Sequence, residues 1–255
     1  MYLQNYTWPE VSAMDIGSKI VVLPLGSIEQ HGHHLPVSTD SDLAGGVAVA
    51  VERRMPQDLV LLPTLWCGHS THHLAFPGTV SVSQGVYQAL IGELCDSLVK
   101  MGARKVLLLN GHGGNDLPVR YALRDVKTRH ADVAGLKIVF ASYWALAAQT
   151  LTAVRESGIG GMGHACEMET SLMLVLNGEH VAMNKARRDG PAQVPPYRLT
   201  DMQQGLPYYL VEDFHELSET GTVGHPDLAS REKGERFLAG IVDEVCAFIH
   251  DFQQW

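Results

Sequence analysis

The sequence contains few cysteines and none in close pairs, which limits the sites it can form. Its 255 residues include four cysteines, at positions 67, 95, 166 and 246. A disulfide framework or a thiolate zinc site needs several cysteines at short, regular spacings, such as a CxxC pair. Neither kind of site is indicated here, and the wide spacing predicts a reducing, cytoplasmic environment.

Positive charge and long apolar runs are also scarce. The chain has 19 Lys and Arg against 28 Asp and Glu, a formal net charge of -9. Because nucleic-acid binding depends on clustered Lys and Arg, we expect no nucleic-acid partner. The longest apolar stretches are Ile20–Leu25 and Val106–Leu109, far below the roughly 20 residues of a bilayer helix. Residues 1–15 contain no basic region followed by an apolar run, so we expect no secretory signal. We therefore predict a cytoplasmic protein without a membrane partner.

What the sequence does contain is an alternation of apolar runs and amphipathic stretches. Continuous apolar runs are typical of strands covered on both faces, whereas apolar residues every three or four positions are typical of helices. We predict one α/β domain over residues 1–255, a three-layer α/β/α sandwich with a mostly parallel central sheet. The predicted strands cover residues 20–25, 59–65, 105–109 and 136–141, and the predicted helices cover residues 42–55, 83–101 and about 115–130.

The C-terminal third combines an irregular segment with one further helix. Prolines at positions 191, 195, 196 and 207 mark residues 177–222 as an irregular excursion rather than a second domain. Ser230 suits a helix N-cap, and apolar residues from Phe237 to Phe252 recur at helical spacing. That stripe fits either the core or a subunit interface.

Side chains able to bind metal ions follow two of the predicted strands. Glu29, His31 and Asp40 come after the first strand, and His112 lies in a glycine-flanked turn after the strand 105–109. Ligands bind at the carboxyl ends of parallel strands, so these residues should converge. Carboxylates with imidazoles suit zinc, manganese or iron(II) rather than calcium. Histidines that are merely exposed or hydrogen-bonded in a turn are the alternative.

A third candidate segment, Gly163–Thr170, leads into an apolar helix. It contains His164, Glu167 and Glu169. A carboxylate at a helix start is often only a charge placed against the helix dipole, and for Glu169 this explanation is as good as a ligand role. We therefore assign the chemistry of this segment to His164 and Glu167.

These motifs, taken in order, resemble the creatininase family of metal-dependent amidohydrolases over nearly the whole chain. Several separate motifs in the right order are more specific than any one of them. The residues that carry the resemblance are Glu29–Pro36 with Asp40, Phe76–Thr79, Asn110–His112, Ser142–Trp144, His164 with Glu169–Leu172, and Ser230–Gly234.

The resemblance implies a creatininase-like fold and two divalent metal ions per chain, which could be zinc, manganese or iron. In the family, an aspartate at the position of Asp40 bridges the two ions. The family ligands correspond here to Glu29, His31, Asp40 and His112.

One further ligand is missing from the family pattern. The creatinine-hydrolysing members have a glutamate where this chain has Gly114. We expect Glu167 to supply the missing carboxylate, with Glu169 as the second choice. By resemblance, His164 carries no metal and donates a proton in catalysis.

The substrate contacts also differ from those of the creatinine-hydrolysing members. Those members have an aromatic residue at the position of Gly113 and a tryptophan near the position of Gly160, whereas Trp144 is retained here. Ser70 and His73 precede the Phe76–Thr79 motif and are expected at the rim of the pocket. The predicted substrate-binding residues are Ser70, His73, Gly113 and Trp144.

The predicted function is hydrolysis of a carbon–nitrogen bond in a small, preferably cyclic amide. Two bridged divalent ions can lower the pKa of a shared water from 15.7 toward roughly 7, and His164 would protonate the leaving nitrogen. A formamide deformylase or peptide amidase on the same centre is an alternative, and a non-catalytic metal-binding protein is another. The family is commonly oligomeric, often hexameric, so a homo-oligomer is expected.

Overall fold

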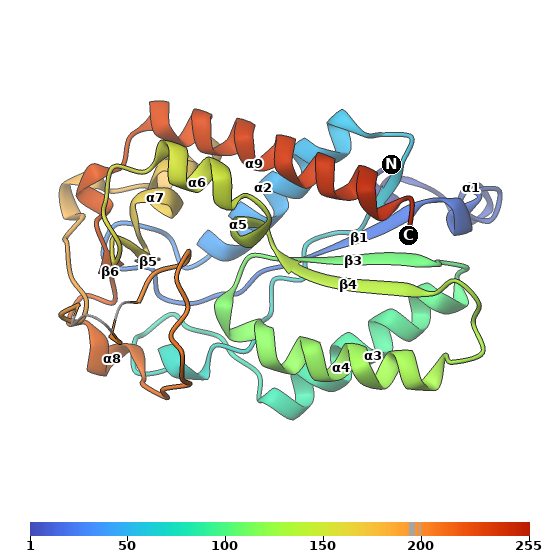
Figure 1. Ribbon diagram of the computed structural model, residues 1–255, viewed down its shortest axis with the longest axis horizontal. Helices are drawn as coiled ribbons and strands as arrows, with labels where there is room; N and C mark the ends of the chain where they lie inside the picture. Colours follow the sequence, from blue (N-terminus) through green and yellow to red (C-terminus); the bar gives the residue numbers. More distant parts are fainter. Residues whose placement is uncertain (194–196, 199) are drawn as a thin grey trace.

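A computed structural model describes residues 1–193, 197–198 and 200–255 of the chain. A central parallel sheet lies between two layers of helices, as Figure 1 shows. The predicted three-layer α/β fold with a mostly parallel sheet is confirmed. Two of the four prolines of the irregular segment, Pro195 and Pro196, lie outside the described residues.

The central sheet has four parallel strands in the order β2-β1-β3-β4. Each of the first three strands is followed by a helix that returns the chain to the same end of the sheet, so the connections between these strands are crossovers. The chain moves outward from β1 to β2 and then back past β1 to β3. The strands are β1 (Ile20–Leu25), β2 (Leu59–Leu61), β3 (Lys105–Asn110) and β4 (Lys137–Ser142).

Long helices cover both faces of this sheet (Figure 1). One face carries α3 (Gln84–Lys100) and α4 (Asp116–Arg129). The other carries α2 (Thr39–Arg54), α7 (Glu167–Leu176) and α9 (Arg231–Phe252). Ser230 caps α9, since its side chain accepts a hydrogen bond from the Lys233 backbone N–H at 3.2 Å.

The hydrophobic core occupies both faces of the sheet because alternate strand residues point to opposite sides. Val22 and Leu107 pack with α2, α7 and α9, whereas Val21 and Leu108 pack with α3 and α4. Phe237, Ile241 and Val245 of α9 are fully buried in the first of these clusters. The apolar stripe of α9 is therefore largely core within this chain.

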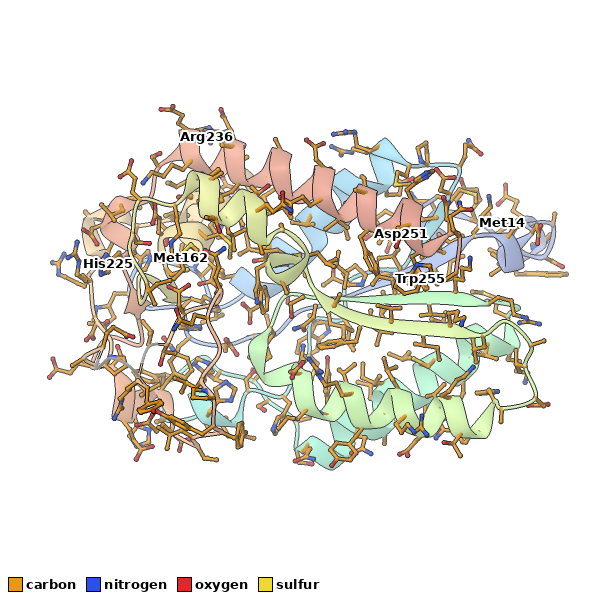
Figure 2. All side chains as sticks on the ribbon, viewed as in Figure 1. Met14, Met162, His225, Arg236, Asp251 and Trp255 are labelled. Carbon is orange, nitrogen blue, oxygen red and sulfur yellow. The ribbon has the colours of Figure 1, made fainter. Side chains whose placement is uncertain are left out.

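Shorter elements close one end of the molecule. Strands β5 (Met162–His164) and β6 (Val223–Gly224) pair in an antiparallel ribbon. Figure 2 shows Met162 and His225 at this end and Trp255 far from them, near the end of α9. The remaining elements are η1 (Leu3–Asn5), α1 (Trp8–Ser12), η2 (Ile16–Ser18), η3 (Thr71–His73), η4 (Gly113–Asn115), α5 (Tyr143–Leu146), α6 (Ala148–Val154), η5 (Gly178–His180), η6 (Met183–Lys185), α8 (Phe214–Leu217) and η7 (Pro226–Leu228).

The sequence-based predictions located the sheet and its long helices to within a few residues. The helix α2 begins at Thr39, three residues earlier than expected, so Asp40 lies in its first turn rather than in a loop. The ribbon of β5 and β6 and the short helix α8 were not predicted. No helix among the described residues combines the length and apolar character that crossing a membrane requires.

Candidate metal centre

The predicted ligands converge because β1 and β3 are neighbours in the sheet. Leu25 and Asn110, the last residues of these strands, stand opposite each other in the parallel register. The strand order reverses between β1 and β3, and this is where open α/β sheets bind ligands. Chain leaving β1 supplies Glu29 and His31, and chain leaving β3 supplies His112.

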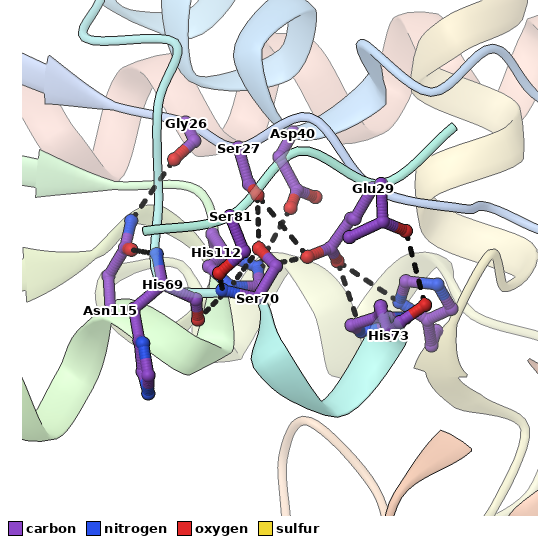
Figure 3. Close-up of polar contacts among 12 residues, drawn as sticks. Gly26, Ser27, Glu29, Asp40, His69, Ser70, His73, Ser81, His112 and Asn115 are labelled. Carbon is purple, nitrogen blue, oxygen red and sulfur yellow. Dashed lines mark hydrogen bonds and ion pairs between the residues drawn. The ribbon is translucent and has the colours of Figure 1, made fainter. Parts of the chain in front are cut away.

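Asp40 lies at the middle of the cluster. One of its oxygens, Oδ1, is 3.1 Å from His31 Nε2, and the other, Oδ2, is 2.9 Å from His112 Nδ1. Glu29 Oε2 lies 3.1 Å from the same His112 nitrogen. Figure 3 shows Asp40, Glu29 and His112 turned toward one another. A single carboxylate thus faces two imidazoles from opposite sides.

Three overlapping sets of side chains could each hold a metal ion. Within each set, the candidate ligand atoms lie within 4.8 Å of one another. Asp40 belongs to two of the sets, as a bridging carboxylate would. The first set is Glu29, Asp40 and His112, the second is His31, Asp40 and Glu169, and the third is Glu29, His31 and His164.

Glu169 therefore joins the cluster, and Glu167 does not, which corrects the expected order of the two. Glu167 accepts hydrogen bonds from Lys233 Nζ at 2.8 Å and from the backbone N–H of Ser157 at 2.9 Å. Residues two apart on an α-helix are rotated by about 200° around the helix axis, so their side chains point to nearly opposite sides. Since both residues lie in the first turn of α7, only one of them can face the strand ends, and that one is Glu169.

The segment before α7 places His164 and Glu169 on the same side. His164 ends β5, and Ala165 follows it with a φ of 48°, the left-handed region that non-glycine residues rarely adopt. This turn reverses the chain between β5 and α7. The Glu169 carboxylate also accepts a hydrogen bond from the Cys166 backbone N–H at 3.2 Å, which holds it at the helix start.

Burial and mutual charge shift the pKa values of the clustered carboxyl groups. Burial, aided by the Asp40 charge, raises the pKa of Glu29. Burial likewise raises the pKa of Glu169 to about 7. Burial also opposes ionisation of Asp40, but His31 and His112 outweigh it and lower the pKa of Asp40. The cluster therefore concentrates negative charge at Asp40.

The imidazoles that face these carboxylates shift in the opposite sense. Burial lowers the pKa of His31, but Asp40 and Glu169 outweigh it and raise the pKa to about 9. Burial also lowers the pKa of His112, but the Glu29 and Asp40 carboxylates outweigh it and raise that pKa well above its usual value. These histidines are protonated at positions where a divalent cation could displace the proton, since neutral imidazole is the form that binds metal.

Two buried polar atoms support this replacement. Among the described residues, six buried side-chain atoms have no hydrogen-bond partner, and two of these, His31 Nε2 and Asp40 Oδ2, belong to the cluster. Buried polar atoms normally have a partner, and an exception calls for an explanation such as an ion. Both atoms belong to the candidate ligand sets, so carboxylate and imidazole donors here fit divalent metal ions.

His164 lies beside the cluster, with its two nitrogens in different surroundings. Its Nε2 is 2.8 Å from the backbone carbonyl oxygen of Gln30, an arrangement in which Nε2–H donates. Its Nδ1 faces the cluster, 3.8 Å from Glu29 Oε1. Burial, reinforced by the charge of His31, lowers the pKa of His164 well below its usual value. The imidazole is therefore neutral near pH 7.

Gln30 also orients His73, a contact that the sequence did not reveal. The Gln30 side-chain amide donates to Nδ1 of His73 at 2.9 Å. The other nitrogen of His73, Nε2, lies 3.3 Å from Glu29 Oε1 and can donate to it. His73 thus holds Glu29 in place from outside the cluster, as groups around metal ligands commonly do.

Ser70 lies behind His112, not at the rim of the pocket as predicted. Its side chain is fully buried, with Oγ 3.1 Å from His112 Nε2 and in close contact with Ser27 Oγ. Figure 3 shows Ser70 between Ser27 and His112. The backbone carbonyl oxygen of His69 lies 3.1 Å from the same nitrogen. Ser70 therefore fixes the His112 ring, and His112 Nδ1 is left to face Glu29 and Asp40.

Two asparagines connect the strand ends beneath this site. Asn110 Nδ2 donates to the His112 carbonyl oxygen at 2.7 Å, and Asn115 Nδ2 donates to the Gly26 carbonyl oxygen at 3.1 Å. Asn115 Oδ1 accepts from the His69 backbone N–H at 3.1 Å, which Figure 3 also shows. Both asparagines flank His112 in the sequence, but nothing local predicted their partners.

Gly114 leaves no room for the glutamate that the resemblance led us to look for at this position. A Cβ placed on Gly114 would lie 2.2 Å from the His69 carbonyl oxygen and 2.6 Å from His72 Cε1. Real Cβ atoms do not approach backbone this closely. The backbone at His69 and the ring of His72 thus occupy the space of the missing side chain.

A cavity of about 270 Å³ opens above the cluster. Three of the predicted substrate contacts, His73, Gly113 and Trp144, line it together with His164. Met202 and Phe214 also line it, and no motif pointed to either of them because both lie within residues 177–222, where no regular pattern was found. Among the described residues that line the cavity there is no Lys or Arg.

The sheet is doubly wound, and carboxylate and imidazole side chains meet where its strand order reverses. These features define the chain as an α/β protein with a candidate dinuclear metal centre. The model of the creatininase family, described as creatinine amidohydrolase, matches residues 4–249. The chain belongs to the creatininase family of metal-dependent amidohydrolases.

Individual relatives agree with this assignment. The chain is 29% identical over 260 residues to a creatinine amidohydrolase of Pseudomonas putida, covering 96% of this chain and 93% of the relative. It is 30% identical over 235 residues to a mycofactocin precursor peptide peptidase of Mycobacterium tuberculosis, covering 89% and 83%. These named substrates differ from each other, so membership alone does not identify the substrate of this chain.

Solved structures resemble the whole chain and include metal-loaded forms. A creatinine amidohydrolase structure superposes with a TM-score of 0.84 at 28% identity, covering 98% of this chain and 96% of the other. A variant creatininase described as Zn-Zn type and a creatininase described with Mn each superpose with a TM-score of 0.83 at 28% identity, covering 98% of this chain and 97% of theirs. Zinc and manganese are thus metals of these relatives.

Proposed function

We propose that this chain hydrolyses the carbon–nitrogen bond of a small, uncharged amide, with cyclic amides first, at a centre of two divalent ions. The observation that carries the proposal is the sharing of Asp40 between two candidate ligand sets that contain buried atoms without hydrogen-bond partners. One ion would be held by Glu29, Asp40 and His112, and the other by His31, Asp40 and Glu169. Zinc, manganese and iron(II) all accept these ligands.

The ions and the surrounding residues would divide the chemistry between them. When bound, such ions lower the pKa of water and polarise a carbonyl group. His73 holds Glu29 in position, and Ser70 holds the His112 ring. These supporting contacts keep the ligands in one orientation while the substrate changes, as an efficient centre requires.

His164 is the residue that moves the proton. Because its pKa is lowered and Nε2–H is engaged with Gln30, Nδ1 is free to accept a proton from the attacking water. The same nitrogen can then pass that proton to the leaving nitrogen of the amide, which departs poorly as an anion. His164 also lies within ligand distance of Glu29 and His31, so its role needs a test that measures metal content.

The surroundings of the cavity favour an uncharged substrate. A phosphorylated nucleotide would need Arg or Lys near the cavity, and the described lining residues include neither. A peptide amide is the second candidate, because a Cβ on Gly113 would meet no atom within 4 Å and the cavity is open there. A longer substrate could leave the site past this residue.

The test is metal analysis of the purified protein, followed by a screen of lactams, hydantoins, creatinine, formamides and short peptides for hydrolysis. We expect two ions per chain and turnover of at least one amide. His164→Ala should keep both ions and lose about 100-fold or more of kcat. Two ions without any hydrolysis would favour a non-catalytic metal-binding protein. Less than one ion, unaffected by Glu29→Gln, would refute the metal centre itself.

Three further properties remain predictions. We expect the protein to act in the cytoplasm, as a single domain over residues 1–255, and as a homo-oligomer, with a hexamer as the family pattern. Light scattering at several concentrations measures the oligomeric state.

A further inference from the structure

Phe214 has an unusual position for a residue of an irregular segment. It begins the short helix α8, and its half-buried ring lines the cavity above the metal ligands. The ring centroid lies 3.9 Å from that of His73, with 23° between the planes, and 4.6 Å from that of His164. A large apolar ring thus stands directly beside the residue that moves the proton.

The other apolar side chains of the cavity come from separate elements. Trp144 belongs to α5, and Met202 lies in the irregular segment before α8. Unlike the ring of Phe214, the ring of Trp144 makes no aromatic contact with His164. Phe214 is therefore placed to contact the part of a substrate that adjoins His164.

The position of His164 decides which part of the substrate contacts Phe214. In the proposed function, His164 passes its proton to the leaving nitrogen, so the substituent on that nitrogen must lie near the His164 ring. Flat aromatic surfaces bind planar or apolar groups through stacking and edge contacts at centroid distances of about 4.5–7 Å. No described cation lines the cavity to attract an anionic substituent.

We propose that Phe214 is a specificity-determining residue that selects amides with a flat, uncharged substituent on the leaving nitrogen. The proposal rests on the proposed function for the side of the substrate it assigns. Phe214 takes no part in bond cleavage. Its ring contributes to substrate binding and therefore acts mainly on KM.

The first test compares two amides that share a formyl group and differ only on nitrogen. These are formanilide, which carries a phenyl ring there, and N-methylformamide. We expect wild type to prefer formanilide in kcat/KM, and Phe214→Ala to reduce that preference by about 2- to 10-fold, the range of one aromatic contact. The change should appear in KM, and Phe214→Tyr should restore the preference because it keeps the ring.

The controls separate loss of the ring from loss of the fold. Phe214→Leu keeps an apolar side chain without a flat ring, and it should behave like Phe214→Ala. Tyr209→Ala removes a 78% exposed aromatic residue from the same irregular segment and should leave the preference unchanged. Metal content and the unfolding temperature of every variant are measured alongside. An unchanged preference in both Phe214→Ala and Phe214→Leu, with metal retained, would overturn the proposal.

The second test does not depend on turnover. Aniline represents the leaving side of formanilide, and its binding to the metal-loaded protein can be measured by titration calorimetry. We expect about 2- to 10-fold weaker aniline binding in Phe214→Ala and recovery in Phe214→Tyr. Weaker binding in a protein that hydrolyses neither formamide would support the Phe214 contact while counting against the proposed function. Equal aniline affinity in wild type and Phe214→Ala would overturn the proposal.

Discussion

The floor and the wall of the cavity are built in different ways. The floor consists of Glu29, His31, Asp40 and His112, which follow two adjacent parallel strands, and Glu169 at the start of a buried helix. The wall consists of Trp144, Met202 and Phe214, which come from short or irregular elements. Ligands on rigid elements keep their geometry, whereas irregular chain can change its side chains at little cost to the fold. This difference explains how relatives that share one fold can be named for different substrates.

The largest expected effect comes from breaking the floor at its shared ligand. Asp40→Asn should remove both ions together, because Asp40 belongs to both ligand sets. Residues that only support metal ligands change affinity or activity by about 10- to 100-fold, so loss of the shared ligand should exceed about 100-fold. Metal content by mass spectrometry and kcat measure this. Asp42→Asn, in the same helical turn, is the matched control, and loss of only one ion in Asp40→Asn would contradict sharing.

The second prediction separates the two glutamates of α7. Glu169→Gln should lose one of two ions, whereas Glu167→Gln should keep both. Glu167→Gln should instead lower the free energy of unfolding by about 1.5 kcal/mol, because Lys233 loses one of its two carboxylate partners and keeps only the exposed Glu156, 3.0 Å away. Urea unfolding and metal analysis of both variants measure these effects. Loss of metal in Glu167→Gln at unchanged stability would reverse the assignment.

The pH dependence of the Glu167–Lys233 pair follows from the same contacts. Burial opposes ionisation of Glu167, but the hydrogen bonds from Lys233 and Ser157 outweigh it and lower the pKa of the carboxyl group. A carboxyl pKa that is lower in the folded protein stabilises the fold above the unfolded value of about 4.3, and the effect is lost as pH falls through the folded pKa. The stability difference between wild type and Glu167→Gln should therefore be constant near pH 7 and shrink in acid.

The third prediction concerns the support behind the floor. Ser70→Ala should weaken metal affinity by about 10-fold, the lower end for a group that orients a ligand, since His112 Nε2 keeps the His69 carbonyl oxygen as a partner. Competition with a chelator measures the affinity. Ser97→Ala, on the exposed side of α3, should have no effect. If Ser70→Ala changed KM alone, Ser70 would contact substrate as the sequence first suggested.

The smallest expected effect lies at the turn between β5 and α7. Ala165→Gly should change the free energy of unfolding by less than about 1 kcal/mol, because the strain relieved at a φ of 48° is offset by the lost burial of the Ala165 methyl group and by the greater chain entropy of glycine. Ala89→Gly, in the exposed face of α3, should cost about 1 kcal/mol. Thermal unfolding of the two variants measures the difference. A loss in Ala165→Gly larger than that in Ala89→Gly would show that relief of backbone strain does not offset the lost methyl group.

The sequence predicted the sheet, the long helices and four of the five cluster residues. It could do so because apolar periodicity is local, and because parallel strands necessarily bring their carboxyl ends to one edge. Glu167 was ranked above Glu169 because the direction of each side chain depends on how α7 is rotated about its own axis. Neighbouring elements decide that rotation. Ser70 was misplaced for a similar reason, since only the approach of the 69–73 segment to His112 puts it behind that ring.

The sequence by itself determined that two strand ends carry carboxylate and imidazole groups suited to a pair of divalent ions. Only the tertiary structure decided that Glu169 completes the cluster, that Ser70 and His73 orient ligands, and that Phe214 faces His164. These contacts join residues that lie far apart along the chain. Their geometry depends on the packing of whole helices and loops, and no short stretch of sequence contains that information.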